Sequence, residues 1–314
     1  MSYQLPPFNY LSIEQFLLSR LGVALDLYIY APVSTSCAAY RFPPKQSRTS
    51  DVRSPPQPRA FKLTELKRPS LYRSKEQQRV MYACAIALQL SPLLKLPALE
   101  IATALAQLVR QQTDEQDFLV QVMPSGLIHL ELTEPSLAAW LQRLIQAPPT
   151  TYTPTPLLPA TPTPLFPIQY AHARCCSLMQ LAHREGLLTL KQINADTSAA
   201  LWLVVAPNPI PWLNLEQKLY LSHPTERALI AQLLALLDDL DCYFPSPKVV
   251  DWHKAGANLS QAFQSFYSHC RIWGEVKNQN LQLAQARLGL VLISQSVLRL
   301  LLQERLSAIA PLEL

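Results

Sequence analysis

A proline-rich segment divides the chain into two parts. Residues 147–167 contain eight prolines, half of them in Thr-Pro repeats. Such a run favours extended polyproline II structure and forms a semi-rigid spacer. The chain of 314 residues is long enough for two domains, each with its own apolar core. We therefore expect a domain boundary at this segment.

A second break lies in residues 41–70, which are rich in proline, serine and glutamine. Between Arg41 and Arg79 there are eleven Lys or Arg residues and three acidic ones, whereas the whole chain has a net charge of +5. The remainder of the chain is therefore slightly acidic. No apolar period appears before about Pro69, which predicts a flexible linker. Two roles remain open for it: a solvated spacer, or an electrostatic arm for RNA phosphates.

Glycine is scarce, with six residues in the whole chain. No two glycines are close enough to form the phosphate-binding loops GxGxxG or GxxxxGK[ST]. Few glycines and many leucines and alanines favour a mainly helical protein. Since 49% of the residues are apolar, most of the chain should fold.

The N-terminal part is predicted to combine helices with a β-hairpin. In residues 1–40 the pattern indicates a helix from Leu11 to Leu25 and a strand from there to Tyr30. Residues 71–146 form a predicted small α+β domain. Its expected elements are a helix over residues 80–88, a helix over 97–109, strands over 118–123 and 127–132 joined at Gly126, and a helix over 135–145.

Residues 168–314 are predicted to form an antiparallel helical bundle. Four segments carry apolar residues at helical spacing: 168–182, a segment that starts at His223, 259–270, and 281–306. Between the first two, residues 201–205 look like a strand and residues 207–211 like a rigid loop.

The sequence offers little catalytic or metal-binding chemistry. None of the six histidines has partners at the spacing of a helical zinc site together with a third ligand. The six cysteines include no CxxC pair, so we expect them to be reduced and mostly buried. There is no GxSxG motif, and the acidic clusters lie at predicted helix ends. We expect no metal and no cofactor.

No uninterrupted apolar stretch approaches the length that a bilayer requires. The N-terminus also lacks the basic and apolar regions of an export signal. We therefore expect a cytoplasmic protein that does not enter membranes.

Four phrases in the C-terminal part resemble the anticodon-binding helical bundle of arginyl-tRNA synthetases, the DALR domain. They occur in family order, each on a predicted helix: Tyr170-Ala-His-Ala-Arg174, His223-Pro-Thr-Glu-Arg-Ala-Leu229, Leu259-Ser-Gln-Ala-Phe263 and Ala286-Arg-Leu-Gly-Leu-Val291. The resemblance marks eight family positions, which we expect to be mainly structural: Tyr170, His172, Arg174, His223, Pro224, Glu226, Arg227 and Phe263.

The segment before the proline-rich run is similar to the N-terminal domain of the same synthetases, through Ala83–Leu88, Pro124–Leu130 and Trp140-Leu141. In that family the nucleotide-binding catalytic domain lies between the two modules. Here the intervening segment has about twenty residues, whereas each βαβ unit of such a fold needs about thirty. Nothing resembles the HIGH or KMSK motifs. The resemblance therefore implies a synthetase-like protein that is not an enzyme, although arginine–tRNA ligase is the activity of the family.

The resemblance implies tRNA as the partner, of arginine type. Recognition of unpaired bases requires aromatic rings or guanidinium planes for stacking and cations for the phosphates. Six residues are candidates: Tyr267, Arg271, Trp273, Lys277, Arg287 and Arg299. Core packing is the alternative for Tyr267 and Trp273. A scaffold that binds a protein partner is the alternative function, and ligase activity is the third.

Overall fold

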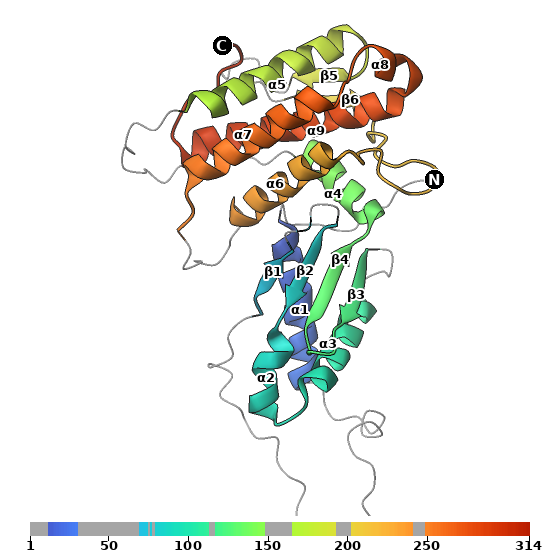
Figure 1. Cartoon of the computed structure of the whole chain (residues 1–314), viewed down its shortest axis with the longest axis vertical. Coiled ribbons are helices and arrows are strands. Elements are labelled where there is room, and N and C mark those ends of the chain that lie inside the picture. The colour runs from blue at the N-terminus through green and yellow to red at the C-terminus, as the bar shows by residue number, and fades with distance from the viewer. Residues whose placement is uncertain are drawn as a thin grey trace, which may run out of the picture.

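The computed structural model describes residues 12–30, 69–74, 76, 79–112, 117–147, 165–192, 202–240 and 249–314. The fold is mainly helical, with a small antiparallel sheet in the N-terminal part and a helical bundle in the C-terminal part (Figure 1). This confirms the fold class predicted from the sequence. Most of both predicted linkers, 41–70 and 147–167, lies outside the described residues.

The N-terminal sheet has four strands in the order β1-β2-β4-β3. Their bounds are Leu71–Arg73 for β1, Met81–Cys84 for β2, Phe118–Val122 for β3 and Ile128–Leu132 for β4. The predicted hairpin of β3 and β4 is confirmed, with Phe118 opposite Leu132. Its turn depends on Gly126, which has a φ of +86° and no room for a Cβ beside Ala98.

The helix predicted over residues 80–88 is wrong in its first half. Residues Met81–Cys84 form the strand β2, and the helix α2 runs from Ile86 to Leu94. Along β2 the buried side chains are Tyr82 and Cys84, which alternate with half-buried neighbours. Because β2 pairs with β4, about 45 residues later in the chain, a distant partner decides the structure of this segment.

Two long helices cover one face of the sheet, α1 (Ile13–Tyr30) and α3 (Ala98–Gln112). Figure 1 shows both behind the strands. The strand predicted over residues 25–30 is wrong, because α1 continues through Tyr30. Leu25 and Tyr28 pack against the core from this helix, so tertiary packing outweighs the β-propensity of the segment. The rings of Phe16 and Phe118 stack at 5.6 Å between centroids and join α1 to the sheet.

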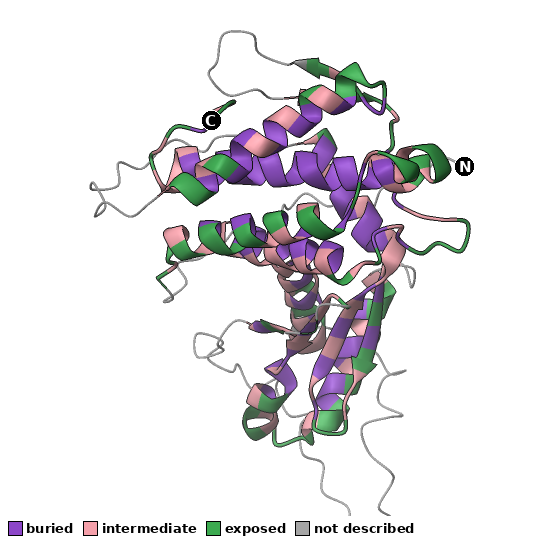
Figure 2. Cartoon of the chain, turned by 45° about the horizontal axis from the view of Figure 1, so that its top comes forward, coloured by how far each residue is buried: buried purple, intermediate pink, exposed green. Residues whose placement is uncertain are grey.

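The C-terminal bundle is built around one buried helix, α9. The helices are α5 (Phe166–Arg184), α6 (Pro224–Leu240), α7 (Trp252–His269), α8 (Glu275–Gln279) and α9 (Leu281–Leu300), and a π-helical turn, Leu301–Arg305, extends α9. The predicted strand is confirmed as β6 (Trp202–Ala206), which pairs with β5 (Thr189–Gln192). Figure 2 shows α9 buried along most of its length.

Residues Leu281–Arg305 form a helix that is long and apolar enough to cross a bilayer by length and composition. Its sequence is interrupted by glutamine, arginine and serine residues, so it is not the uninterrupted apolar stretch that the sequence analysis looked for. Its most apolar window is 94% buried inside the fold. Such burial is what the core helix of a helical bundle requires.

Buried polar contacts join the N-terminal part to the bundle. The carboxylate of Asp238 on α6 accepts hydrogen bonds from the hydroxyls of Ser12 and Tyr82, both at 2.7 Å. The Arg73 guanidinium donates to the Ala231 carbonyl at 3.0 Å. We call this contact region, between α6 and the N-terminal part, the seam.

The helix α4 (Glu134–Gln146) connects the two parts. Its N-cap is Thr133, whose hydroxyl accepts from the Ser136 amide. Near its end, the side-chain oxygen of Gln142 accepts from the Ile210 amide and from the Trp212 indole, both at 3.0 Å. The Trp212 ring lies so close to Gly289 of α9 that a Cβ there would be 2.5 Å away. The predicted rigid loop therefore fills the space between α4 and α9.

Candidate nucleic-acid interface

Two exposed aromatic rings stack at the start of α5. Phe166 and Tyr170 have 62% and 43% of their surface exposed, and their ring centroids are 6.0 Å apart. Residues four apart lie on the same face of a helix, so Arg174 follows them on this face. An exposed pair of large aromatic rings is unusual on a folded surface and provides a platform on which a base can stack.

The same face continues onto α7 through Arg174. Its guanidinium donates to the Tyr267 hydroxyl at 2.7 Å and lies 5.1 Å above the centre of the Tyr267 ring. Tyr267 in turn stacks at 6.3 Å on Phe263, which is buried. These contacts fix the half-buried Arg174 and Tyr267 in place. We call Phe166, Tyr170, Arg174 and Tyr267 the aromatic ribbon.

The ribbon combines residues to which the sequence analysis gave different roles. Tyr267 is one of the six RNA-binding candidates, whereas Tyr170 and Arg174 were expected to be mainly structural. Phe166 is absent from both sets. Its spacing of four residues from Tyr170, and of eight from Arg174, is visible in the sequence and would have indicated it. Phe166 was missed because the sequence analysis assigned it to the proline-rich linker that ends at Pro167, whereas α5 already begins at Phe166.

Three more candidates lie where α7 leads into α8. Arg271 is exposed and Trp273 is half-buried against the core. Lys277 forms an ion pair with Glu185 at 2.6 Å and keeps 33% of its side chain exposed. These residues leave a cation and part of an aromatic ring accessible at this end of the bundle.

Arg287 lies inside the bundle instead. Its Nε donates to Glu226 at 2.7 Å, and only 11% of its side chain and 1% of that of Glu226 are exposed. A second nitrogen of its guanidinium donates to the Arg271 carbonyl. The other oxygen of Glu226 accepts from the His223 amide at 2.8 Å, which caps the start of α6. Arg287 thus neutralises a buried carboxylate.

Arg299 is also directed inward, with 4% of its surface exposed. Its guanidinium lies 3.4 Å from the side-chain oxygen of Gln303, and burial lowers the pKa of Arg299. Neither Arg287 nor Arg299 presents its charge to the surface. Of the six candidates, four keep part of their side chains at the surface: Tyr267, Arg271, Trp273 and Lys277.

His172 holds the end of the chain against α5. Its Nε2 accepts from the Gln295 amide at 3.0 Å, so its Nδ1 carries the proton and donates to the Pro311 carbonyl at 2.8 Å. Burial lowers the pKa of His172 to about 4, so the ring is neutral at pH 7. The Sγ of Cys176 lies 3.9 Å from both ring nitrogens. This arrangement is that of a structural histidine.

The remaining family positions lie at the start of α6. His223 accepts from the Thr225 amide at 3.2 Å, and its ring stacks on His269 at 6.3 Å. Pro224 is exposed in the first turn. Arg227 is buried and pairs with Glu134 of α4 at 2.8 Å. These contacts order the beginning of α6 and attach it to α4.

Among the described residues, no group of three or more His, Cys, Asp or Glu side chains could hold a metal ion. Four cysteines fall in this part of the chain, and all are free and buried, as expected: Cys84, Cys175, Cys176 and Cys270. Burial raises their pKa values, which keeps the thiols protonated.

The bundle matches a known family. Residues 168–304 match the DALR anticodon binding domain. The arginine–tRNA ligase of Synechococcus sp. (strain JA-3-3Ab) is 34% identical over 134 residues, which are 42% of this chain and 19% of that protein. The enzyme of the same name from Heliobacterium modesticaldum is 32% identical over 134 residues, which are 43% of this chain and 20% of that protein.

The chain thus matches about a fifth of the length of these curated relatives. No solved structure matches the chain significantly. The match with the family covers α7, α9 and α5 from residue 168 onward, so it includes Tyr170, Arg174 and Tyr267 but begins two residues after Phe166. Residues 168–304 of this chain are therefore similar to the DALR anticodon binding domain, and a small α+β module precedes them in the chain.

Proposed function

We propose that this protein binds tRNA through the aromatic ribbon and does not catalyse aminoacylation. The observation that carries the proposal is the exposed stack of Phe166 and Tyr170 in a domain of anticodon-binding type. Unpaired bases of an anticodon loop stack on such rings, and Arg174 adds a guanidinium plane for another base. The names of the relatives favour an arginine-type tRNA.

Two features support the non-catalytic half of the proposal. The similarity to the ligases is confined to about 134 residues, and these coincide with the bundle. Both sheets of the described residues are antiparallel, whereas a nucleotide-binding synthetase core is built from parallel βαβ units. A purified chain that exchanged pyrophosphate into ATP in the presence of arginine and tRNA would overturn this half.

Filter binding of purified tRNA at low salt tests the binding half. We expect Phe166→Ala and Tyr170→Ala each to weaken binding about 5-fold to 150-fold, because one stacked base contributes about 1–3 kcal/mol. The control is Leu215→Ala, which removes a fully exposed apolar side chain from a loop outside the ribbon. Binding that is absent at low salt, or that is unchanged in both ribbon variants, contradicts the proposal.

A protein-binding scaffold is the second candidate function. It is favoured by the apolar character of the same surface, since Ile309 is 73% exposed and its carbonyl is bonded to Gln169 of α5 at 3.0 Å. Affinity capture from cells separates the two functions. Recovery of one stoichiometric protein without RNA, lost in Tyr170→Ala, favours the scaffold, and recovery of tRNA favours the first proposal.

A further inference from the structure

The corner between α2 and α3, residues 88–100, lies at the end of the N-terminal part that is farthest from the bundle (Figure 1). We call these residues the leucine corner. Four of its leucines have between 37% and 46% of their surface exposed: Leu88, Leu93, Leu96 and Leu99. Two prolines of the corner, Pro92 and Pro97, are exposed as well. Single exposed apolar residues are ordinary, whereas a group as dense as this one marks a contact surface.

The fold of the chain does not use these leucines. The helix α2 contributes Ile86, Ala87 and Leu90 to the core, while Leu88 and Leu93 are exposed on the same helix. A helix that is apolar all round is normally buried on all sides. The turn after α2 is fixed, because the Ser91 hydroxyl donates to the Leu96 carbonyl at 2.7 Å. The leucine corner is therefore an ordered apolar surface.

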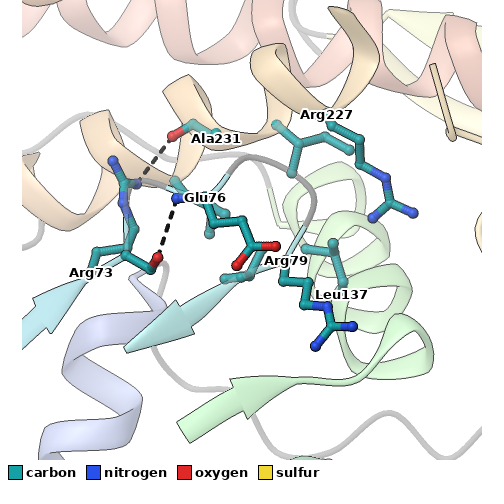
Figure 3. Close-up of a pocket in the computed structure, with 10 residues that line it drawn as sticks. Arg73, Glu76, Arg79, Leu137, Arg227 and Ala231 are labelled. Carbon is teal, nitrogen blue, oxygen red and sulfur yellow. Dashed lines mark hydrogen bonds between the residues drawn. The ribbon is translucent and has the colours of Figure 1, made fainter. Parts of the chain in front are cut away.

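The seam shows how the same chain covers apolar side chains elsewhere. Leu137 of α4 and Ile230 of α6 are buried there, and Arg73 reaches across to donate to the Ala231 carbonyl at 3.0 Å (Figure 3). The cavity that remains at the seam has about 20 Å³, which is room for one water molecule. Nothing in the described part of the chain covers the leucine corner to this extent.

Two opposite charges lie among the apolar side chains of the corner. Lys95 and Glu100 are both exposed, and neither forms an ion pair with another described residue. They are the charged residues of the segment 88–100, so the corner has no net charge. It lacks the excess of cations that attracts RNA phosphates or anionic lipids.

A neutral surface with both charges is complementary to itself. When two copies of one patch meet across a two-fold axis, residue i of one copy faces residue j of the other, and the reverse contact forms at the same time. Lys95 and Glu100 satisfy this condition, because each supplies the charge that the other lacks. A second copy of the chain thus matches both the apolar side chains and the charges of the corner.

We propose that the leucine corner is a contact between two copies of this chain, related by a two-fold axis. The leucines of the two copies cover one another, and Lys95 pairs with the partner subunit's Glu100. The corner has fewer residues than the roughly 20–30 a side of a stable interface, so the dimer is weak and depends on protein concentration. The corner and the aromatic ribbon lie in different parts of the molecule, so a dimer carries two ribbons.

Sedimentation velocity of the full chain over a wide range of concentrations tests the inference. We expect the mass to rise from that of a monomer to that of a dimer. Leu93→Ser together with Leu96→Ser should weaken the dimer at least 10-fold, because apolar surface is then no longer buried between the copies. The matched control is Leu119→Ser on β3, which removes a side chain that is 48% exposed outside the corner. Urea unfolding verifies that each variant is folded.

An exchange of charges tests the two-fold arrangement itself. Lys95→Glu alone and Glu100→Lys alone each place like charges opposite one another twice, so each should weaken the dimer at least 5-fold. An equal mixture of these two variants restores opposite charges across the axis. With a fluorescent label on one variant, the mixture should associate about as tightly as the wild type.

Four outcomes overturn the inference. They are a wild type that stays monomeric at all concentrations, a dimer that is unchanged in Leu93→Ser/Leu96→Ser, charge variants that associate no better mixed than alone, and binding of a different protein that this double variant abolishes. A monomeric wild type that the same double variant destabilises would show that another part of this chain covers the corner.

Discussion

The interior of the helical bundle and its outer surface use charged side chains in different ways. Inside, Arg287 and Glu226 form a buried pair with hydrogen bonds to the backbone on both sides. On the surface, Lys277 and Glu185 are each about one-third exposed and make a single contact. Arg287 and Lys277 were candidates for the same role in the sequence analysis, so the comparison teaches that burial decides what a cation can bind.

The buried pair should be the more sensitive of the two. We expect Glu226→Ala to lower the free energy of unfolding by about 3–5 kcal/mol, because it leaves the Arg287 charge buried without a partner. It also removes the cap on the His223 amide. Urea unfolding followed by circular dichroism measures the effect. A loss below about 1 kcal/mol would show that solvent reaches Arg287 and that it is free to bind an external anion.

A double variant sharpens this prediction. Glu226→Leu together with Arg287→Met replaces both charges by apolar groups, and buried ion pairs often tolerate such a replacement. We expect the double variant to regain most of the stability that Glu226→Ala loses. Failure to regain it would indicate that the hydrogen bonds to His223 and Arg271, and not the pair itself, stabilise this region.

His172 gives the interior of the bundle a pH dependence. The pKa of His172 is about 4 in the folded protein, below the ordinary value of 6.5, so the unfolded chain binds more protons between these values. The free energy of unfolding is therefore not reduced by His172 above about pH 7, and it falls by about 3 kcal/mol as the pH falls to 4. Urea unfolding at several pH values measures it. His172→Gln should reduce the slope between pH 7 and 4, and an unchanged slope would assign it to other groups.

The helices of the bundle could be predicted because each carries its own apolar period. The residues Leu259, Phe263 and Phe266 of α7 are all buried and spaced by three or four, so local sequence was sufficient. The strand β2 could not be predicted in this way. Its alternation of buried Tyr82 and Cys84 covers only four residues, which is too short to predict a strand. The strand forms because it pairs with β4, which the chain reaches about 45 residues later.

The candidate site shows the same division between local and distant information. The spacing of Phe166, Tyr170 and Arg174 is local and predicts that they share a helix face. The contact of Arg174 with Tyr267 joins residues 93 positions apart, and the pairing of Arg287 with Glu226 joins residues 61 apart. A sequence without an alignment carries no direct record of such pairs. For this reason the inward-directed Arg287 was grouped with Arg271 and Lys277, which lie at the surface.

Gln142 also connects the two parts of the molecule, and we expect it to contribute less to the free energy of unfolding than the buried pair of Glu226 and Arg287. Its side-chain oxygen accepts from two buried donors, the Ile210 amide and the Trp212 indole. We expect Gln142→Leu to cost about 2 kcal/mol, because both donors lose their acceptor in a buried site. Thermal and urea unfolding measure this loss. Gln146→Leu, on the exposed last turn of α4, is the matched control and should change the stability by less than about 0.5 kcal/mol.

The surface pair should show the smallest effect on stability and a distinct effect on binding. We expect Lys277→Gln to change the free energy of unfolding by less than about 1 kcal/mol, because exposed ion pairs contribute little. If Lys277 contacts a tRNA phosphate, the same change reduces the slope of the logarithm of affinity against that of salt concentration by about 1. Glu185→Gln releases Lys277 from its partner and should strengthen binding slightly. Equal affinities and equal salt slopes in both variants would exclude Lys277 from the interface and leave the aromatic ribbon as the remaining contact on the bundle, together with Arg271 and Trp273.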